Sequence, residues 1–208
     1  MSSLIIKSIN YQYPGSQVNI FDGFSEIFET DKLYRLVGPN GAGKTTLLEL
    51  IAGLRKPKNG EITLGNYPIM RTDVSYLSSE SSLVPELNIE EHLGLIATLW
   101  KMTEDNLREF YRDCFELLEM FNLLSRNDTV DNFSLGMKEK LDFLLTISRP
   151  SKVILLDEPF GALDLPSLNL AQKVLMEYTK NKVCIIVTHR DEIVSPLVVT
   201  EIPIERNV

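Results

Sequence analysis

The stretch from Gly38 to Thr45, GPNGAGKT, combines residue types and spacing that specify a definite chemistry. It follows the pattern G-x-x-x-x-G-K-[ST] at every fixed position, and its glycines let consecutive backbone N–H groups surround phosphate oxygens. Lys44 is placed to contact the β- and γ-phosphates, and the Thr45 hydroxyl is placed to ligate Mg²⁺. We therefore expect a nucleoside triphosphate to bind here. The residues expected to hold it are Gly38, Pro39, Asn40, Gly41, Ala42, Gly43, Lys44, Thr45 and Thr46.

Two adjacent carboxylates, Asp157 and Glu158, follow the apolar run Val153–Leu156. At the carboxyl end of a strand beside a phosphate loop, one carboxylate can reach Mg²⁺ while its neighbour orients a water molecule. A lone Asp-Glu pair is more often part of a solvated turn. The apolar run before this pair and the phosphate loop upstream favour the catalytic interpretation.

The elements that would position these groups alternate between short apolar runs and helical patterns. A strand at Leu33–Val37 leads into the phosphate loop, and a helix at Thr45–Leu54 follows it. From about Ile89 to Ser125 the pattern changes, and apolar residues at three- and four-residue spacing are typical of an amphipathic helix whose apolar face is core: Leu107, Phe110, Cys114, Leu117 and Phe121. Further strands are predicted at Leu4–Ile9, Phe24–Phe28, Glu61–Leu64, Val74–Leu77, Val153–Leu156, Val183–Val187 and Leu197–Ile202.

This order predicts an α/β fold, a P-loop NTPase with a mainly parallel central sheet, antiparallel strands near the N-terminus and an inserted helical subdomain. We expect one domain over residues 1–208. Residues 1–80 and 151–208 would form the core with its N-terminal β region, and residues from about 81 to 150 the helical subdomain.

Four further motifs resemble those of the ABC ATPase family, and with the phosphate loop they cover nearly the whole chain. Phe133–Met137, FSLGM, lies where the family signature belongs, and Phe160–Asp164 resembles the D-loop after the catalytic carboxylates. Thr188-His189 resembles the switch histidine, and Tyr13 resembles the aromatic residue that stacks on adenine. The five motifs occur in the family's order and at its separations.

The resemblance implies an ATPase that uses ATP and Mg²⁺, with Lys44, Glu158 and His189 as catalytic residues and Asp157 as a metal ligand. Ser134 and Gly136 would act on the ATP of a partner subunit. It also implies a second ABC ATPase subunit, in a homodimer or heterodimer, and a separate transmembrane permease. The chain would then be cytoplasmic and peripheral on the inner face of the cell membrane.

The sequence departs from the family pattern at two places. Ser79 aligns with the Q-loop glutamine, and a serine would reach Mg²⁺ only through a water molecule; an offset that brings Ser78 or Glu80 to the site is the alternative. In the signature, Leu135 replaces the first glycine and Met137 the glutamine. An SLGM signature followed by lysine resembles bacterial exporters, which favours an export-type system.

Composition narrows the remaining alternatives. The chain has 208 residues and a net charge of −8, which argues against a nucleic-acid partner because phosphate backbones are held by clustered basic residues. No stretch is apolar enough for a signal peptide or a membrane span. Cys114 and Cys184 are expected to be buried reduced thiols, and His92 to be structural. A soluble ABC ATPase of DNA repair or translation, or a non-hydrolysing regulatory cassette, remains as an alternative function.

Overall fold

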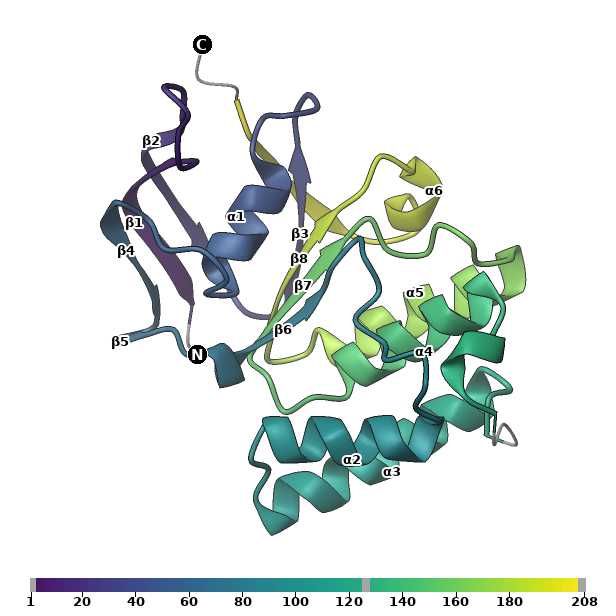
Figure 1. The fold of residues 1–208 in the computed structure, drawn as a ribbon. Helices are drawn as coiled ribbons and strands as arrows, with labels where there is room; N and C mark the ends of the chain where they lie inside the picture. Colours follow the sequence, from purple (N-terminus) through teal and green to yellow (C-terminus); the bar gives the residue numbers. More distant parts are fainter. Residues whose placement is uncertain (1–2, 125–127, 206–208) are drawn as a thin grey trace. The chain divides into compact units, whose positions relative to one another are not determined.

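The computed structural model describes residues 3–124 and 128–205 (Figure 1). The internal contacts divide the chain into two units. Unit 1 comprises Met1–Tyr76, Ser151–Asp157 and Thr179–Val208, and unit 2 comprises Leu77–Pro150 and Glu158–Tyr178. Residues 77–80 and 158–178, expected to belong to the core, group with the helices of unit 2.

The first of the two β layers of unit 1 is a parallel sheet. Its strand order is β6-β7-β8-β3-β9, and β7, β8, β3 and β9 run parallel. Every residue of β7 and of β8 is buried, as expected for apolar runs in a sheet covered on both faces. The bounds are β3 Lys32–Val37, β6 Val74–Leu77, β7 Val153–Asp157, β8 Val183–Val187 and β9 Val199–Pro203.

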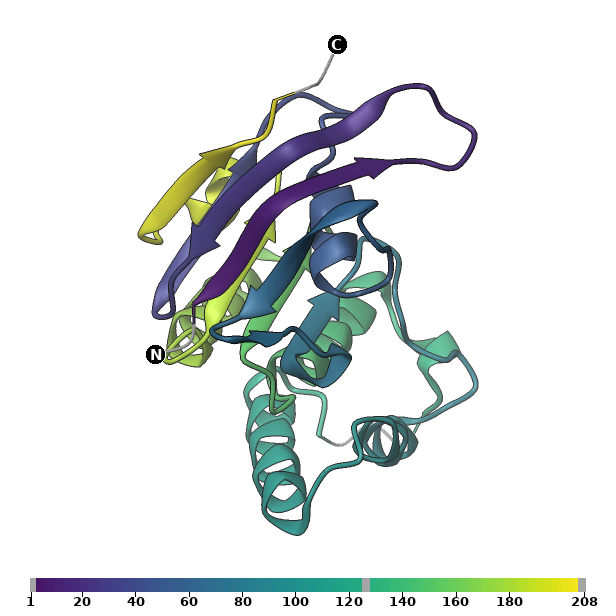
Figure 2. The same ribbon diagram turned by 90° about the vertical axis from the view of Figure 1, so that its left-hand side faces the viewer.

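An antiparallel sheet of order β2-β1-β4-β5 forms the second layer, and the helix α1, Lys44–Ile51, lies between the two sheets (Figures 1 and 2). Apolar side chains of α1 and of both sheets belong to one buried cluster. This arrangement confirms the predicted fold class. The other bounds are β1 Leu4–Gln12, β2 Asn19–Phe28, β4 Asn59–Leu64, β5 Tyr67–Pro68, the 3₁₀ turn Arg71–Asp73 and α6 Asp191–Val194.

The described part of unit 2 contains four α-helices, α2 Ile89–Leu99, α3 Glu104–Met120, α4 Leu135–Ile147 and α5 Leu165–Tyr178, with a 3₁₀ turn at Val130–Asn132. The apolar face predicted for α3 is confirmed, since Phe110, Cys114 and Leu117 are buried. Rings of Phe121, Phe143 and Phe160 meet edge to face in this core.

Both cysteines are free and buried, as predicted. Burial raises the pKa of Cys114 and of Cys184 to about 12, so both thiols stay protonated near neutral pH. Among the described residues, no helix combines the length and the apolar character needed to cross a bilayer.

Candidate nucleotide site

The carboxyl ends of three neighbouring strands in unit 1 bring the phosphate loop, Asp157 and Thr188-His189 to one edge of the sheet. In the parallel register, Asp157 at the end of β7 pairs with Val187 at the end of β8, and Val187 pairs with Leu36 of β3. The phosphate loop begins one residue beyond Val37, and Thr188-His189 follow Val187 directly. Ligands of open α/β sheets bind at this kind of edge.

Two glycines of the phosphate loop occupy positions that no side chain could take without displacement. A Cβ atom at Gly38 would lie 2.2 Å from the carbonyl oxygen of Ile204. Gly43 has a φ of 104°, and a Cβ there would lie 2.5 Å from Cγ2 of Ile20. The loop can therefore turn tightly from β3 into α1 because these positions are glycine.

Lys44 and Thr45 begin α1, where the first N–H groups of a helix have no intrahelical acceptor and attract anions. Lys44 is buried, and its Nζ donates to the carbonyl oxygens of Gly38 at 2.8 Å and Pro39 at 3.1 Å. The ammonium is thus held across the loop, while Thr45 is exposed. This geometry suits the phosphate contact expected of Lys44 and the Mg²⁺ contact expected of Thr45.

Tyr76, on β6, is a site neighbour that the sequence analysis missed. Its hydroxyl donates to Oδ2 of the buried Asp157 at 3.3 Å. Burial and the adjacent carboxylate raise the pKa of Tyr76, so the phenol stays protonated and remains a donor. The predicted strand Val74–Leu77 contained this tyrosine, but sequence alone did not indicate that β6 lies beside β7.

Arg35, on β3, is a second residue that the sequence analysis missed. Its guanidinium donates to the carbonyl oxygen of Thr188 at 3.1 Å and pairs with Asp191 at 2.7 Å. The Thr188 hydroxyl in turn accepts from the backbone N–H of Arg190 at 3.1 Å. These contacts fix the backbone on both sides of His189, whose side chain is exposed.

Tyr13 packs against the start of α1. Its hydroxyl lies 2.7 Å from Oγ1 of Thr46, and the Arg55 guanidinium lies 4.8 Å from its ring centroid. The ring also meets Tyr11 edge to face. Tyr13 therefore has a packing role within unit 1, and any base stacked on it would use the ring face that Arg55 leaves open.

The signature residues lie at the start of α4 in unit 2. Ser134 is the N-cap, and its Oγ accepts from the backbone N–H of Met137 at 3.3 Å. Gly136 lies close to the D-loop, since a Cβ there would be 3.1 Å from the carbonyl oxygen of Ala162. Glu139, also missed by the sequence analysis, accepts from the N–H of Ala162 at 2.8 Å. These contacts join the D-loop to the start of α4 within unit 2.

Ser79 and Glu158 also belong to unit 2. Ser79 is exposed in the loop after β6. Glu158 is half-buried and has a φ of 49°, and Phe160 has a φ of 69°. Left-handed backbone at a non-glycine residue costs about 1–2 kcal/mol and concentrates at functional sites, so its occurrence beside Asp157 fits a functional turn.

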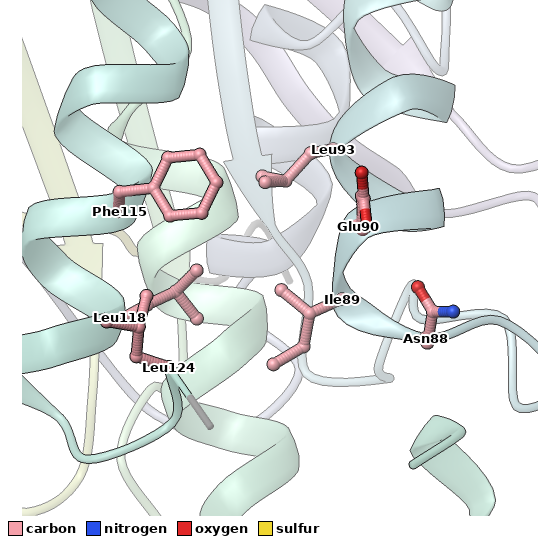
Figure 3. A pocket seen from close by; sticks show the side chains of 7 residues that line it. All are labelled: Asn88, Ile89, Glu90, Leu93, Phe115, Leu118 and Leu124. Atoms are coloured by element: carbon pink, nitrogen blue, oxygen red, sulfur yellow. The ribbon is translucent and has the colours of Figure 1, made fainter. Parts of the chain in front are cut away.

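A pocket of about 410 Å³ in unit 2 is not the nucleotide site (Figure 3). Its lining comes from the start of α2, from α3 and from the segment after α3, and it contains none of the predicted site residues. Apolar side chains dominate the wall, with two polar residues from the start of α2. The lining residues are Asn88, Ile89, Glu90, Leu93, Phe115, Leu118 and Leu124.

The residues of unit 1 fit Mg²⁺ bound together with a nucleotide. Hard cations such as Mg²⁺ take oxygen ligands, usually one or two protein oxygens plus phosphates and waters. The Thr45 hydroxyl and the Asp157 carboxylate offer such oxygens. The described residues form no cluster of three or more His, Cys, Asp or Glu side chains that would hold a metal without a nucleotide.

A glycine-rich loop between a parallel strand and a helix, with a buried aspartate two strands away, defines the class of P-loop nucleoside triphosphatases. The ABC transporter family matches residues 21–161, more than half of the sequence. The chain belongs to this family.

Several known proteins resemble the chain over most of its length. The energy-coupling factor transporter ATP-binding protein EcfA1 of Thermotoga maritima is 34% identical over 196 residues, covering 91% of this chain and 73% of that protein. The uncharacterized ABC transporter ATP-binding protein YybJ of Bacillus subtilis is 29% identical over 200 residues, covering 92% and 88%. The taurine import ATP-binding protein TauB of Pseudomonas fluorescens is 28% identical over 193 residues, covering 91% and 72%.

Solved structures show the same fold. An ATP binding subunit of an ABC transporter superposes with a TM-score of 0.87 at 25% identity, covering 97% of this chain and 85% of that one. The structure of cbiO1 from Clostridium perfringens, part of the ABC transporter complex cbiONQ, gives a TM-score of 0.79 at 22% identity, covering 97% and 84%.

Proposed function

We propose that this protein is the ATP-binding and ATP-hydrolysing subunit of an ABC transporter. The observation that carries the proposal is the edge of the parallel sheet in unit 1. There the phosphate loop, Asp157 and Thr188-His189 lie at the carboxyl ends of three neighbouring strands. Family membership supports it, because ATP-binding proteins of ABC transporters are among the relatives.

In the proposed mechanism, the phosphate loop and Lys44 would bind the phosphates of ATP, and a bound Mg²⁺ would supply positive charge that compensates the transferred group. Thr45 and Asp157 would hold the metal, with Ser79 as a weaker ligand acting through water. Glu158 would orient the attacking water, and His189 would contact the γ-phosphate. Phosphoryl transfer depends mainly on such positioning and charge compensation.

The proposed partners are a second ABC subunit and a separate membrane permease. Ser134 and Gly136 start a helix whose N-terminus would face the ATP held by the second subunit. cbiO1 is described as part of a transporter complex, which supports an assembly of this kind. Through the permease the chain would lie on the inner face of the membrane.

The direction of transport is the finer part of the proposal. The signature Ser134–Met137 favours export, and it is the sole support for that direction. TauB is named an import protein. Transport measured in inside-out and right-side-out vesicles with the permease present decides the question.

The proposal is tested by the ATPase activity of the purified chain, with and without its permease. Lys44→Ala removes the buried ammonium of the phosphate loop and should abolish hydrolysis and weaken ATP binding at least tenfold, because Lys44 contacts the charged phosphates directly. Lys56→Ala removes an exposed ammonium in the segment after α1 and should leave both unchanged.

Two results would overturn parts of this proposal. An ATP dissociation constant of Lys44→Ala within twofold of wild type would refute the role of the phosphate loop. Wild-type protein that binds ATP but hydrolyses none, alone or with the permease, would establish the regulatory cassette instead; the serine at the Q-loop position is the observation that favours this second function.

A further inference from the structure

The connecting loop, Ser78–Asn88, joins β6 to α2 and contains the Q-loop position Ser79. Its first half is tied to the middle of α4 through a single carboxylate. Asp142 Oδ2 accepts from the Ser81 hydroxyl at 2.9 Å and from the backbone N–H of Ser82 at 3.1 Å. Asp142 Oδ1 accepts from the Ser82 hydroxyl at 2.9 Å.

The second half of the connecting loop is held within unit 2 as well. The backbone N–H of Val84 donates to Nε2 of the buried His92 at 2.9 Å, and Nδ1 of the same ring lies 2.8 Å from the carbonyl oxygen of Asn88. Carbonyl oxygens of Pro85 and Leu87 accept from Asp131 N–H at 2.9 Å and Val130 N–H at 3.0 Å. The loop is therefore attached both to α2 and to the turn that precedes Ser134.

α4 carries a second carboxylate, three residues before Asp142. Glu139 accepts from the N–H of Ala162 and so ties α4 to the D-loop. One helix thus connects the connecting loop to the D-loop, and its N-cap is the signature residue Ser134. Helices transmit displacements as rigid elements, so these three segments can move together.

Asp142 is buried, with 4% of its surface exposed. A buried carboxylate is costly unless hydrogen bonds and nearby positive charge compensate it. The three bonds from Ser81 and Ser82 supply the first kind of compensation. Arg149 supplies the nearby positive charge. Burial lowers the pKa of Arg149 to about 10, and the negative charge of Asp142 opposes this lowering in part. A buried, compensated carboxylate holds its partners more firmly than a surface ion pair.

We propose that Asp142 is a positioning residue that fastens the connecting loop to α4, so that a displacement of this loop is passed to Ser134. The expected effect on activity rests on the proposed ATPase function, whereas the attachment of the connecting loop to α4 does not. Asn at position 142 keeps the volume of the side chain but removes its charge, so the hydrogen bonds from Ser81 and Ser82 change from charge-assisted to weaker neutral ones, and Asp142→Asn should loosen the loop.

The first experiment measures hydrogen exchange by mass spectrometry in peptides that cover residues 78–88. We expect the exchange rate of this loop to rise about tenfold in Asp142→Asn, because its anchoring bonds are weakened when the charge of their common acceptor is removed. The double variant Ser81→Ala/Ser82→Ala removes two donors at exposed positions and should show a rise of the same order. Asp105→Asn, which makes the same chemical change at an exposed position of α3, should leave the loop unchanged.

The second experiment separates turnover from binding. In Asp142→Asn and in Ser81→Ala/Ser82→Ala, kcat for ATP should fall about tenfold, while the ATP dissociation constant stays within twofold because the phosphate loop lies in unit 1. The triple variant should be no slower than Asp142→Asn alone, since all three changes break one link.

The outcomes distinguish this inference from the proposed function. Unchanged exchange in residues 78–88 of both variants, or kcat effects that add in the triple variant, would overturn the role of Asp142 while wild-type ATPase activity stands. A wild-type protein without ATPase activity would refute the proposed function, and the exchange measurement would still decide whether Asp142 holds the loop. If Asp142→Asn does not fold, both measurements are made on Ser81→Ala/Ser82→Ala.

Discussion

At the scale of single residues, two tyrosines of unit 1 contact groups of the proposed nucleotide site. Tyr76 donates to the buried carboxylate of Asp157, and Tyr13 is joined to Thr46 at the start of α1. The first contact stabilises a buried charge, and the second supports the helix that follows the phosphate loop. Each of these two contacts is lost when the tyrosine hydroxyl group is removed.

Tyr76→Phe should lower the free energy of unfolding by about 1–3 kcal/mol, because it leaves a buried carboxylate with one donor fewer. Urea denaturation at pH 7 measures this loss. Tyr111→Phe, on α3, removes a hydroxyl far along the chain from Asp157 and serves as the matched control. Equal stability of Tyr76→Phe and wild type would show that the 3.3 Å contact contributes nothing.

Tyr13→Ala should weaken ATP binding by about 1–3 kcal/mol if the ring stacks on adenine, the range measured for base–aromatic stacking in nucleic-acid systems. Tyr13→Phe keeps the ring and loses the bond to Thr46, so its affinity should stay within about threefold of wild type. Titration calorimetry compares the two variants. Equal affinity of Tyr13→Ala and wild type would leave the ring with its packing role alone.

At the scale of elements, the sequence predicted the parallel strands and the phosphate loop well because their patterns are local. The apolar run Val183–Val187 is β8 with the predicted bounds, and the run Val153–Leu156 is β7 with one more residue at its end, Asp157. It did not resolve α2 or α5, although Asn88 and Glu91 form a capping box at the start of α2 that marks a helix N-terminus.

The contacts of Arg35, Tyr76, Glu139 and Asp142 could not be predicted, because each joins segments that are distant in sequence. Strand order decides the first two, and the packing of loops on α4 decides the others. A carboxylate within an apolar helical stretch, as at Asp142, is the signal that could have indicated a buried partner.

Two glycines in helices of unit 2, Gly94 and Gly136, allow a comparison of the same substitution in an open and in a crowded position. A Cβ at Gly94 in α2 would meet nothing within 4 Å, so Gly94→Ala should stabilise the protein by up to about 1 kcal/mol. A Cβ at Gly136 would lie 3.1 Å from the Ala162 carbonyl oxygen, so Gly136→Ala should gain less or lose stability. Urea denaturation compares them, and a larger gain for Gly136→Ala would contradict the close approach to the D-loop.

At the scale of the whole molecule, the proposed machinery is divided between the two units. Unit 1 holds the phosphate loop, Asp157 and His189, and unit 2 holds Glu158, Ser134 and Gly136. We propose that Ser134 and Gly136 complete the ATP site of a second copy or of a related subunit. ATP would then join two chains, and each chain would contribute a different part to each site.

The measurement that tests this account most directly is sedimentation of Glu158→Gln with ATP and Mg²⁺. Loss of the water-orienting carboxylate should slow hydrolysis and leave binding intact, so ATP should convert this variant from monomer to dimer. Glu158→Gln combined with Ser134→Arg should bind ATP with the same affinity and remain monomeric, because the added side chain would obstruct the start of α4. A monomeric Glu158→Gln protein at saturating ATP, or a dimer that Ser134→Arg does not disrupt, would contradict the shared site.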